Sequence, residues 1–218
     1  MKRAGLLVLA LLLAGCGGGG GGGGKGGNGT TTQAAAQGGC SSATTHTHNR
    51  TLSNEHLKLD PAKTYRLVFE TNCGDFTMTL DQKLAPNATA SLVSLAKRGF
   101  FDDTFIHRIV PGFVIQGGDP TGSGSGGPGY ETHDKVAADA SYVHGVVAMA
   151  KAGTEAAGTA GSQFFVVTGQ DAQLQPDYAV VGKVTDGLDV VDKIGKLGNA
   201  SEQPTRAVVI SKVKVETS

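Results

Sequence analysis

One short stretch combines residue types that could do chemistry on a bound ligand. The run FIHRIVPGFVIQGGD, residues 105–119, is largely apolar, yet it contains Arg108 and Gln116. A guanidinium is rarely buried without a partner, so Arg108 either pairs with an acidic residue that stabilises the fold or faces a ligand. A cation, one or two amides and a set of apolar groups suit the stabilisation of a ligand without a covalent step.

Other kinds of catalytic site have less support. The sequence shows no Ser-His-Asp spacing, no set of metal ligands and no paired carboxylates, so we expect no metal and no cofactor. The glycine-rich run at 122–130 lacks the strand-turn-helix context of a phosphate-binding turn, and we interpret it as a loop. His107 is interpreted as a structural histidine with satisfied ring nitrogens rather than as a base, and His46 and His48 as part of a polar linker.

The elements that must position these residues are mostly short strands. Two β-rich runs on either side of 72–75 predict a hairpin. An apolar stripe between Pro86 and Gly99 predicts a helix, and a second short helix is predicted over 188–197. Further strands are predicted at 104–110, 113–116, 145–150, 163–168 and 179–184, and in the final run RAVVISKVKVE. Many short strands with two helices favour a barrel or a sandwich over a parallel sheet.

The alternation of residues does not determine the register of the hairpin that contains Arg108. A two-residue turn at Pro111-Gly112 would place Arg108 opposite Ile115 instead of Gln116. Pro-Gly also favours a type II turn, which does not suit a tight hairpin. We therefore expect a longer turn or a bulge.

Three motifs in register resemble a known family. FIHRIVPGFVIQGGD, GVVAMAKAG and GSQFFVVT occur in the order and spacing of the cyclophilin family of peptidyl-prolyl isomerases. APNATA and VVGKVTDGLDVVDKI are similar to that family as well, and the resemblance extends from about Tyr65 to Val215. It implies a mainly β fold, a closed eight-stranded antiparallel barrel capped by two α-helices.

The resemblance also implies an activity, the cis-trans isomerisation of the peptide bond before proline. This bond isomerises slowly because amide resonance raises the rotation barrier to about 20 kcal/mol. A donor directed at the prolyl nitrogen stabilises only the twisted transition state, and the family implies that Arg108 is this donor and that Gln116 orients it. The implied substrate-binding residues are Phe113, Val114, Ala150, Lys151, Gln163, Phe165, Leu174 and Tyr178.

Some positions depart from the pattern of many cyclophilins. Gln173 stands where many members have Trp, Tyr178 where many have His, and Lys151 where Asn is frequent. Because Gln lacks the contact area and the N–H of an indole, we expect cyclosporin-like macrocycles to bind weakly. Phe164 and Phe165 point to opposite faces of their strand, and only the resemblance selects Phe165 for the pocket.

The first residues, MKRAGLLVLALLLAGC, resemble the signal peptide of a bacterial lipoprotein. A basic start precedes an apolar segment that is too short to span a bilayer, which needs about 20 apolar residues. The resemblance implies cleavage of residues 1–15 and lipidation of Cys16; the alternative is an ordinary secretory signal. We therefore expect an extracytoplasmic protein that is lipid-anchored to a bacterial membrane.

Composition divides the rest of the chain into two parts. Residues 16–56 are rich in glycine, lack an apolar period and predict a flexible tether, whereas residues 57–218 predict the isomerase domain. The 19 basic and 19 acidic residues balance, so no broad positive field would attract nucleic acid. Export makes a disulfide between Cys40 and Cys73 possible, but the sequence leaves this pairing open.

The expected function is that of a monomeric isomerase that acts on Pro-containing segments of exported or envelope proteins. Two alternatives stay open. In the first, the pocket binds such segments without catalysis; in the second, the chain is a structural envelope lipoprotein with a vestigial pocket. An isomerase assay on an X-Pro peptide, with and without Arg108→Ala, distinguishes the three.

Overall fold

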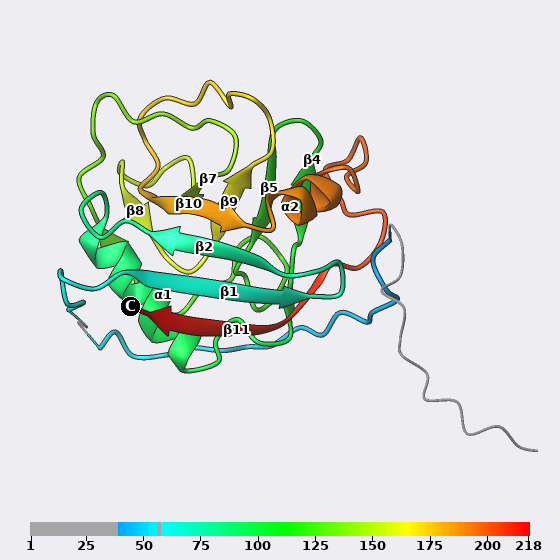
Figure 1. The fold of residues 1–218 in the computed structure, drawn as a ribbon, viewed down its shortest axis with the longest axis horizontal. Coiled ribbons are helices and arrows are strands. Elements are labelled where there is room, and N and C mark those ends of the chain that lie inside the picture. The colour runs from blue at the N-terminus through cyan, green and yellow to red at the C-terminus, as the bar shows by residue number, and fades with distance from the viewer. Residues whose placement is uncertain (1–38, 56–57) are drawn as a thin grey trace, which may run out of the picture. The chain divides into compact units, whose positions relative to one another are not determined.

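The computed structural model describes residues 39–55 and 58–218 (Figure 1). The predicted signal peptide, the lipidation site Cys16 and most of the predicted tether lie outside the described residues. Within the described residues, no helix is long and apolar enough to cross a membrane.

Nine strands form one antiparallel sheet in the order β3-β11-β1-β2-β10-β7-β9-β5-β4 (Figure 1). Their bounds are β1 (Tyr65–Thr71), β2 (Phe76–Leu80), β3 (Thr104–Phe105), β4 (Arg108–Val110), β5 (Val114–Gly117), β7 (Val146–Met149), β9 (Phe164–Val167), β10 (Val180–Asp186) and β11 (Val209–Thr217). A separate two-stranded sheet pairs β6 (Thr132–His133) with β8 (Thr159–Ala160). The predicted strands are all present, and the sequence missed only this small pair.

The large sheet curls, but its hydrogen-bond ladder does not close. The residues between β3 and β4 bond in two directions: Ile106 N–H donates to the Val208 carbonyl at 2.9 Å and His107 N–H to the Gln116 carbonyl at 3.1 Å. The predicted strand 104–110 is therefore divided between the two edges of the sheet. The expectation of a closed eight-stranded barrel is wrong in strand number and closure, because the structure is a curled nine-stranded half-barrel with two helices.

Helix α1 (Pro86–Lys97) begins and ends where the sequence predicts. Proline suits the first turn, where its missing N–H is not needed. The N–H groups of Asn87 and Ala88 donate to the two carboxylate oxygens of Asp134, at 3.0 and 2.7 Å. Gly99, just beyond the helix, has φ +66°, a left-handed conformation that glycine adopts without steric cost. Pro86 and the distant Asp134 carboxylate thus stabilise the N-terminal end of α1, and Gly99 stabilises its C-terminal end.

The main core lies between the sheet and the two helices. Helix α1 packs against β1 and β11, and α2 (Leu188–Gly195) packs against β2, β4 and β5. A second apolar cluster lies on the other face of β9: Phe164, 1% exposed, belongs to the main core, whereas Phe165, 4% exposed, belongs to the second cluster. The two adjacent phenylalanines therefore separate the core from the candidate site, as strand geometry requires.

Residues 39–55, assigned to the tether by the sequence, lie along the folded part of the chain without forming a helix or strand; we call them the N-terminal strap (Figure 1). The N–H groups of His48 and Leu52 donate to the carbonyls of Pro120 and Pro128, both at 2.7 Å. A disulfide joins Cys40 to Cys73 at the beginning of the strap.

The side chain of Arg50 fastens the middle of the strap. Its guanidinium donates to the carbonyl oxygens of Gly99, Phe100 and Asp102, at 3.0, 2.9 and 2.6 Å. These carbonyls belong to the turn that follows α1, and that of Gly99 also accepts the N–H of Asp102 at 3.2 Å. The compact unit that begins at Gly38 therefore includes the strap.

Candidate active site

Arg108 and Gln116 lie directly opposite each other in the β4–β5 hairpin. A three-residue turn, 111–113, joins the strands, and Gly112 within it has φ +72°. The expectation of a turn longer than two residues is thus confirmed. The extra residue moves Gln116, rather than Ile115, into register with Arg108, so that both side chains point to the same face of the sheet.

The same row of residues continues across the sheet. Gln116 of β5 lies opposite Phe165 of β9, and Phe165 lies opposite Ala148 of β7. Directly opposite residues share a face of the sheet, so a cation, an amide and an aromatic ring stand side by side on three neighbouring strands. This row places polar donors at the border of the second apolar cluster.

The second apolar cluster contains most of the predicted substrate-binding residues. Val114 and Phe165 are buried in it, and four more of the predicted residues are partly buried and pack against the cluster. Those four are Phe113, Ala150, Leu174 and Tyr178. The Tyr178 ring meets the Phe165 ring edge to face, with 5.5 Å between the centroids. Residues from four separate segments thus form one apolar surface beside Arg108.

A chain of amide hydrogen bonds orients the polar residues. Arg108 Nη1 donates to Gln116 Oε1 at 3.1 Å, and Gln116 Nε2 donates to Gln163 Oε1 at 2.9 Å. Gln163 Nε2 in turn donates to the carbonyls of Gly124 and Gly126, at 3.0 and 2.9 Å. Because every amide in the chain has a donor and an acceptor partner, its orientation is determined. Arg108 is therefore connected to the glycine-rich loop through two glutamines.

Arg108 also has an acidic partner. Its Nε donates to Glu202 Oε2 at 2.7 Å, in an ion pair whose side chains are 34% and 48% exposed. Within residues 39–55 and 58–218, Nη2 of Arg108 has no hydrogen-bond partner. The sequence had left open whether Arg108 pairs with an acid or faces a ligand. In the structure Arg108 has an acidic partner, and the ion pair through Nε leaves other donors of the guanidinium unused.

The glycine-rich loop has a defined shape, which it takes from Asp119. The buried carboxylate accepts hydrogen bonds from Thr121 N–H and Oγ1–H and from the N–H groups of Gly124 and Gly126. Burial raises the pKa of Asp119, but these hydrogen bonds outweigh it and hold the pKa below its ordinary value. The loop borders a cavity of about 680 Å³ that extends from Gln116 to the strap residue Thr51. A peptide bound at the row could continue into this cavity.

Comparison with known proteins agrees with this geometry. Residues 66–215 match the model of a family described as cyclophilin type peptidyl-prolyl cis-trans isomerase. The chain belongs to the cyclophilin family. Its activity is accordingly the cis-trans isomerisation of peptidyl-prolyl bonds.

Relatives and solved structures cover nearly the same part of this cyclophilin. A peptidyl-prolyl cis-trans isomerase of Helicobacter pylori is 39% identical over 150 residues, which cover 62% of this chain and 90% of the relative. A crystal structure of a cyclophilin type isomerase from Cryptosporidium parvum has a TM-score of 0.65 and 30% identity, and the match covers 70% of this chain and 98% of that one. A second structure of that isomerase, determined in the presence of the dipeptide Ala-Pro, has a TM-score of 0.64 and 30% identity and covers 69% of this chain and 98% of that one.

Lys151 supports the pocket of this cyclophilin from inside. Its side chain is 2% exposed, and its ammonium lies 2.6 Å from Asp177 Oδ2 and donates to the Glu155 carbonyl at 3.0 Å. The ammonium also lies 5.5 Å from the centroid of the Tyr178 ring. The two departures from the family pattern, Lys151 and Tyr178, are therefore in contact, and the lysine charge is paired where it lies.

His107 differs from its expected state. The residue is buried as predicted, but neither ring nitrogen has a hydrogen-bond partner within residues 39–55 and 58–218, so the expectation of a satisfied histidine is wrong. Burial lowers the pKa of His107; the Asp119 carboxylate opposes this effect and the Arg108 charge adds to it. The neutral ring therefore places no second charge beside Arg108.

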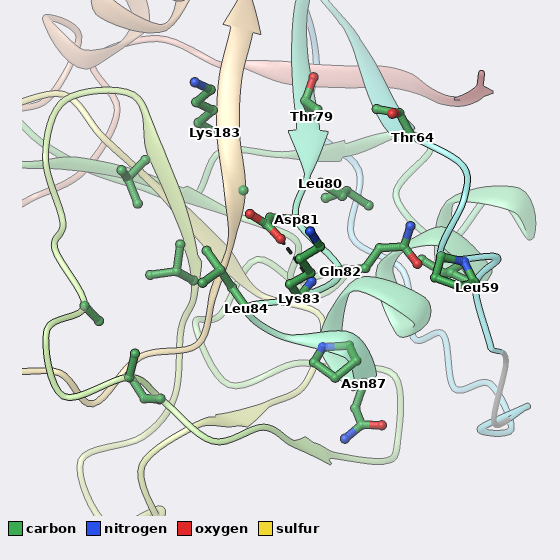
Figure 2. Close-up of a pocket in the computed structure, with 18 of the residues that line it drawn as sticks. Leu59, Thr64, Thr79, Leu80, Asp81, Gln82, Lys83, Leu84, Asn87 and Lys183 are labelled. Atoms are coloured by element: carbon green, nitrogen blue, oxygen red, sulfur yellow. Dashed lines mark hydrogen bonds between the residues drawn. The ribbon is translucent and has the colours of Figure 1, made fainter.

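A larger cavity, of about 1110 Å³, lies away from the candidate site (Figure 2). It is lined by residues from β2, β10 and the start of α1, among them Leu80, Leu84, Asn87 and Lys183. None of the predicted site residues lines it. The volume of a cavity alone would therefore indicate a different site from the row that contains Arg108, whose strands carry the family motifs.

The described residues add no candidate for metal chemistry. Within 39–55 and 58–218, no group of three or more His, Cys, Asp or Glu side chains could hold a metal ion. The residue that sequence reasoning missed is Glu202. It lies 94 positions from Arg108 in the chain, and no local motif connects the two.

Proposed function

We propose that this cyclophilin accelerates rotation of X-Pro bonds through Arg108, with the proline ring held on the second apolar cluster. The observation that carries the proposal is the row formed by Arg108, Gln116 and Phe165 on one face of the sheet. A structure of a similar isomerase, determined in the presence of the dipeptide Ala-Pro, is consistent with a Pro-containing ligand. No covalent step and no cofactor enter the proposed reaction.

The physical basis is the loss of amide resonance as the bond twists. The prolyl nitrogen then regains its lone pair and can accept a hydrogen bond that it cannot accept in the planar ground state. A guanidinium donor at that nitrogen binds the transition state more strongly than either planar isomer. Lowering the barrier by about 7 kcal/mol would accelerate the rotation roughly 10⁵-fold. Phe113, Phe165 and Leu174 would exclude water from the twisting amide.

We further propose that the protein acts outside the cytoplasm on exported or envelope proteins, as a monomer that is lipid-anchored through Cys16. The lipoprotein-like start of the sequence supports this proposal. The disulfide between Cys40 and Cys73 supports it as well, because disulfides persist mainly in oxidising compartments. Mass spectrometry of the membrane fraction should find a lipid-modified Cys16 at the new N-terminus. An unmodified N-terminus in the soluble fraction would refute the anchor.

The test of the catalytic proposal is an isomerase assay on an X-Pro peptide, followed by NMR exchange or by a coupled protease. Arg108→Ala should lower kcat/KM by about 10²- to 10³-fold, the effect of removing one transition-state donor. Far-UV circular dichroism should stay unchanged, because the side chain is partly exposed. Full activity in Arg108→Ala would exclude Arg108 as the donor. Peptide binding by the wild-type protein without isomerisation would favour the binding-module alternative.

A further inference from the structure

The loop after α2 brings one residue, Glu202, into double contact with strand β4. The Glu202 carbonyl accepts the N–H of Ile109 at 2.9 Å, and its carboxylate accepts the Nε–H of Arg108 at 2.7 Å. Backbone and side chain thus bind two consecutive residues of the strand that carries the proposed donor.

Glu202 adopts a backbone conformation that needs an explanation. Its φ is +61°, in the left-handed region, which is sterically unfavourable for a residue with a Cβ atom. Such strain persists only where the surroundings determine it, and it is concentrated at functional sites. The left-handed turn allows the carbonyl and the carboxylate of one residue to reach β4 together.

The loop around Glu202 holds this conformation in place. Asn199 Oδ1 accepts the N–H groups of Ser201 and Gln203, at 2.9 and 3.0 Å, and the Asn199 carbonyl accepts the Glu202 N–H at 3.0 Å. Gly198 allows the loop to approach β4 closely, because a Cβ atom there would lie 2.5 Å from the Ile109 carbonyl oxygen. The position of Glu202 is therefore set by the backbone rather than by its own flexible side chain.

We propose that Glu202 is a positioning residue for the isomerase reaction, an inference that rests on the proposed role of Arg108. Glu202 holds Nε and Gln116 holds Nη1, so the plane of the guanidinium is fixed at two of its three nitrogens. The third nitrogen, Nη2, is left to donate to the prolyl nitrogen. An arginine side chain loses rotamer entropy when it is ordered, and the contacts with Glu202 and Gln116 order it before the substrate binds.

Two other roles of the ion pair between Glu202 and Arg108 predict different results. If the Glu202 carboxylate competed with the substrate for the guanidinium, its removal would raise activity. A carboxylate that only stabilises the fold would affect the melting temperature and leave turnover unchanged. Positioning alone predicts that removal lowers kcat while the fold is retained.

The decisive variant is Glu202→Gly, because glycine relieves the strain at φ +61° while it removes the carboxylate. The melting temperature should stay the same or rise, and kcat should fall about tenfold with little change in KM, since a hydrogen bond to a charged group is lost. Glu202→Gln, whose amide oxygen can accept the same Nε–H, should restore most of the activity. Asp103→Gly is the matched control: Asp103 also has a positive φ, of +59°, but lies outside the site, and its variant should keep wild-type turnover.

The Arg108→Ala background separates this inference from the proposed function. In that background Glu202→Gly should have no further effect on kcat, because the guanidinium that Glu202 positions is absent. If Arg108→Ala is inactive but Glu202→Gly is fully active or faster, positioning is refuted and the role of Arg108 survives. If Glu202→Gly lowers kcat equally in both backgrounds, Glu202 acts independently of Arg108 and the inference is also refuted. If Arg108→Ala itself keeps full activity, the proposed function fails first.

Discussion

The disulfide between Cys40 and Cys73 should contribute a large part of the stability of this cyclophilin. The two cysteines are separated by 33 positions, and the closed loop contains the N-terminal strap. Reduction by dithiothreitol, or the pair of substitutions Cys40→Ser and Cys73→Ser, opens this loop. The strap then depends on its hydrogen bonds to the folded part alone.

The magnitude follows from the entropy of loop closure in the unfolded chain. For a loop of about 33 residues, the chain-entropy relation gives a stabilisation of about 4 kcal/mol at 25 °C. A domain of this size shifts its melting temperature by roughly 2–4 °C per kcal/mol, so the expected loss is on the order of 10 °C. An effect this large is measurable by calorimetry or by dye-monitored melting.

The assay compares the full chain with and without dithiothreitol. The wild-type protein should lose about 10 °C on reduction. The variant with both cysteines replaced should melt at the reduced temperature and should not respond to dithiothreitol. A wild-type melting temperature that is the same in both conditions would refute the reasoning, because either the disulfide does not form or the strap is not held by it.

Reduction should also affect the candidate site, because the strap borders it. The backbone of His48 bonds to Pro120, and Thr51 lines the cavity beside Gln116. Loosening of the strap should therefore raise KM for a longer X-Pro peptide and leave kcat nearly unchanged. A fall in kcat alone would show that the reduced protein is damaged at the row that contains Arg108.

Two further predictions concern single residues of the site. Because burial holds the pKa of His107 below its ordinary value, its contribution to stability is complete above about pH 6.5 and is lost as the pH falls through the folded-state value. The melting temperature of the wild-type protein should therefore decrease more steeply from pH 7 to pH 5 than that of His107→Gln; parallel curves would show that the ring is not held neutral. Wild-type protein should bind cyclosporin-like macrocycles weakly because Gln173 stands where many cyclophilins have Trp, and Gln173→Trp should strengthen binding at least about tenfold. Nanomolar inhibition of the wild-type protein would contradict this expectation.

The parts of the fold that could be predicted are those that single residues or neighbouring residues in the sequence determine. Pro86 and Gly99 delimit α1 because a missing N–H and a left-handed conformation are properties of single residues. The division of 104–110 between β3 and β4 was not predictable in the same way. It depends on the Val208 and Gln116 carbonyls, and the Val208 carbonyl comes from a segment about a hundred residues away in the chain.

The strap was assigned to the tether for a physical reason as well. Its polar composition resembles that of a disordered segment, since it has few apolar side chains to bury. The contacts that order it are instead backbone hydrogen bonds, the carbonyl contacts of Arg50 and a disulfide. The acceptors of such contacts belong to the distant backbone and have no signature in the sequence of the strap.

The same distinction explains why the site could be predicted only in part. Arg108, Gln116 and Phe165 lie on strands, where a period of two and the family motifs indicate a common face. Glu202 and the acceptors of Gln163 lie on loops, and loops take their shape from internal bonds such as those of Asn199. The strands therefore carry Arg108, Gln116 and Phe165, and a loop supplies Glu202, the acidic partner of Arg108. Changes in the loop after α2 should alter the rate of isomerisation, whereas changes in the second apolar cluster should alter which peptides are bound.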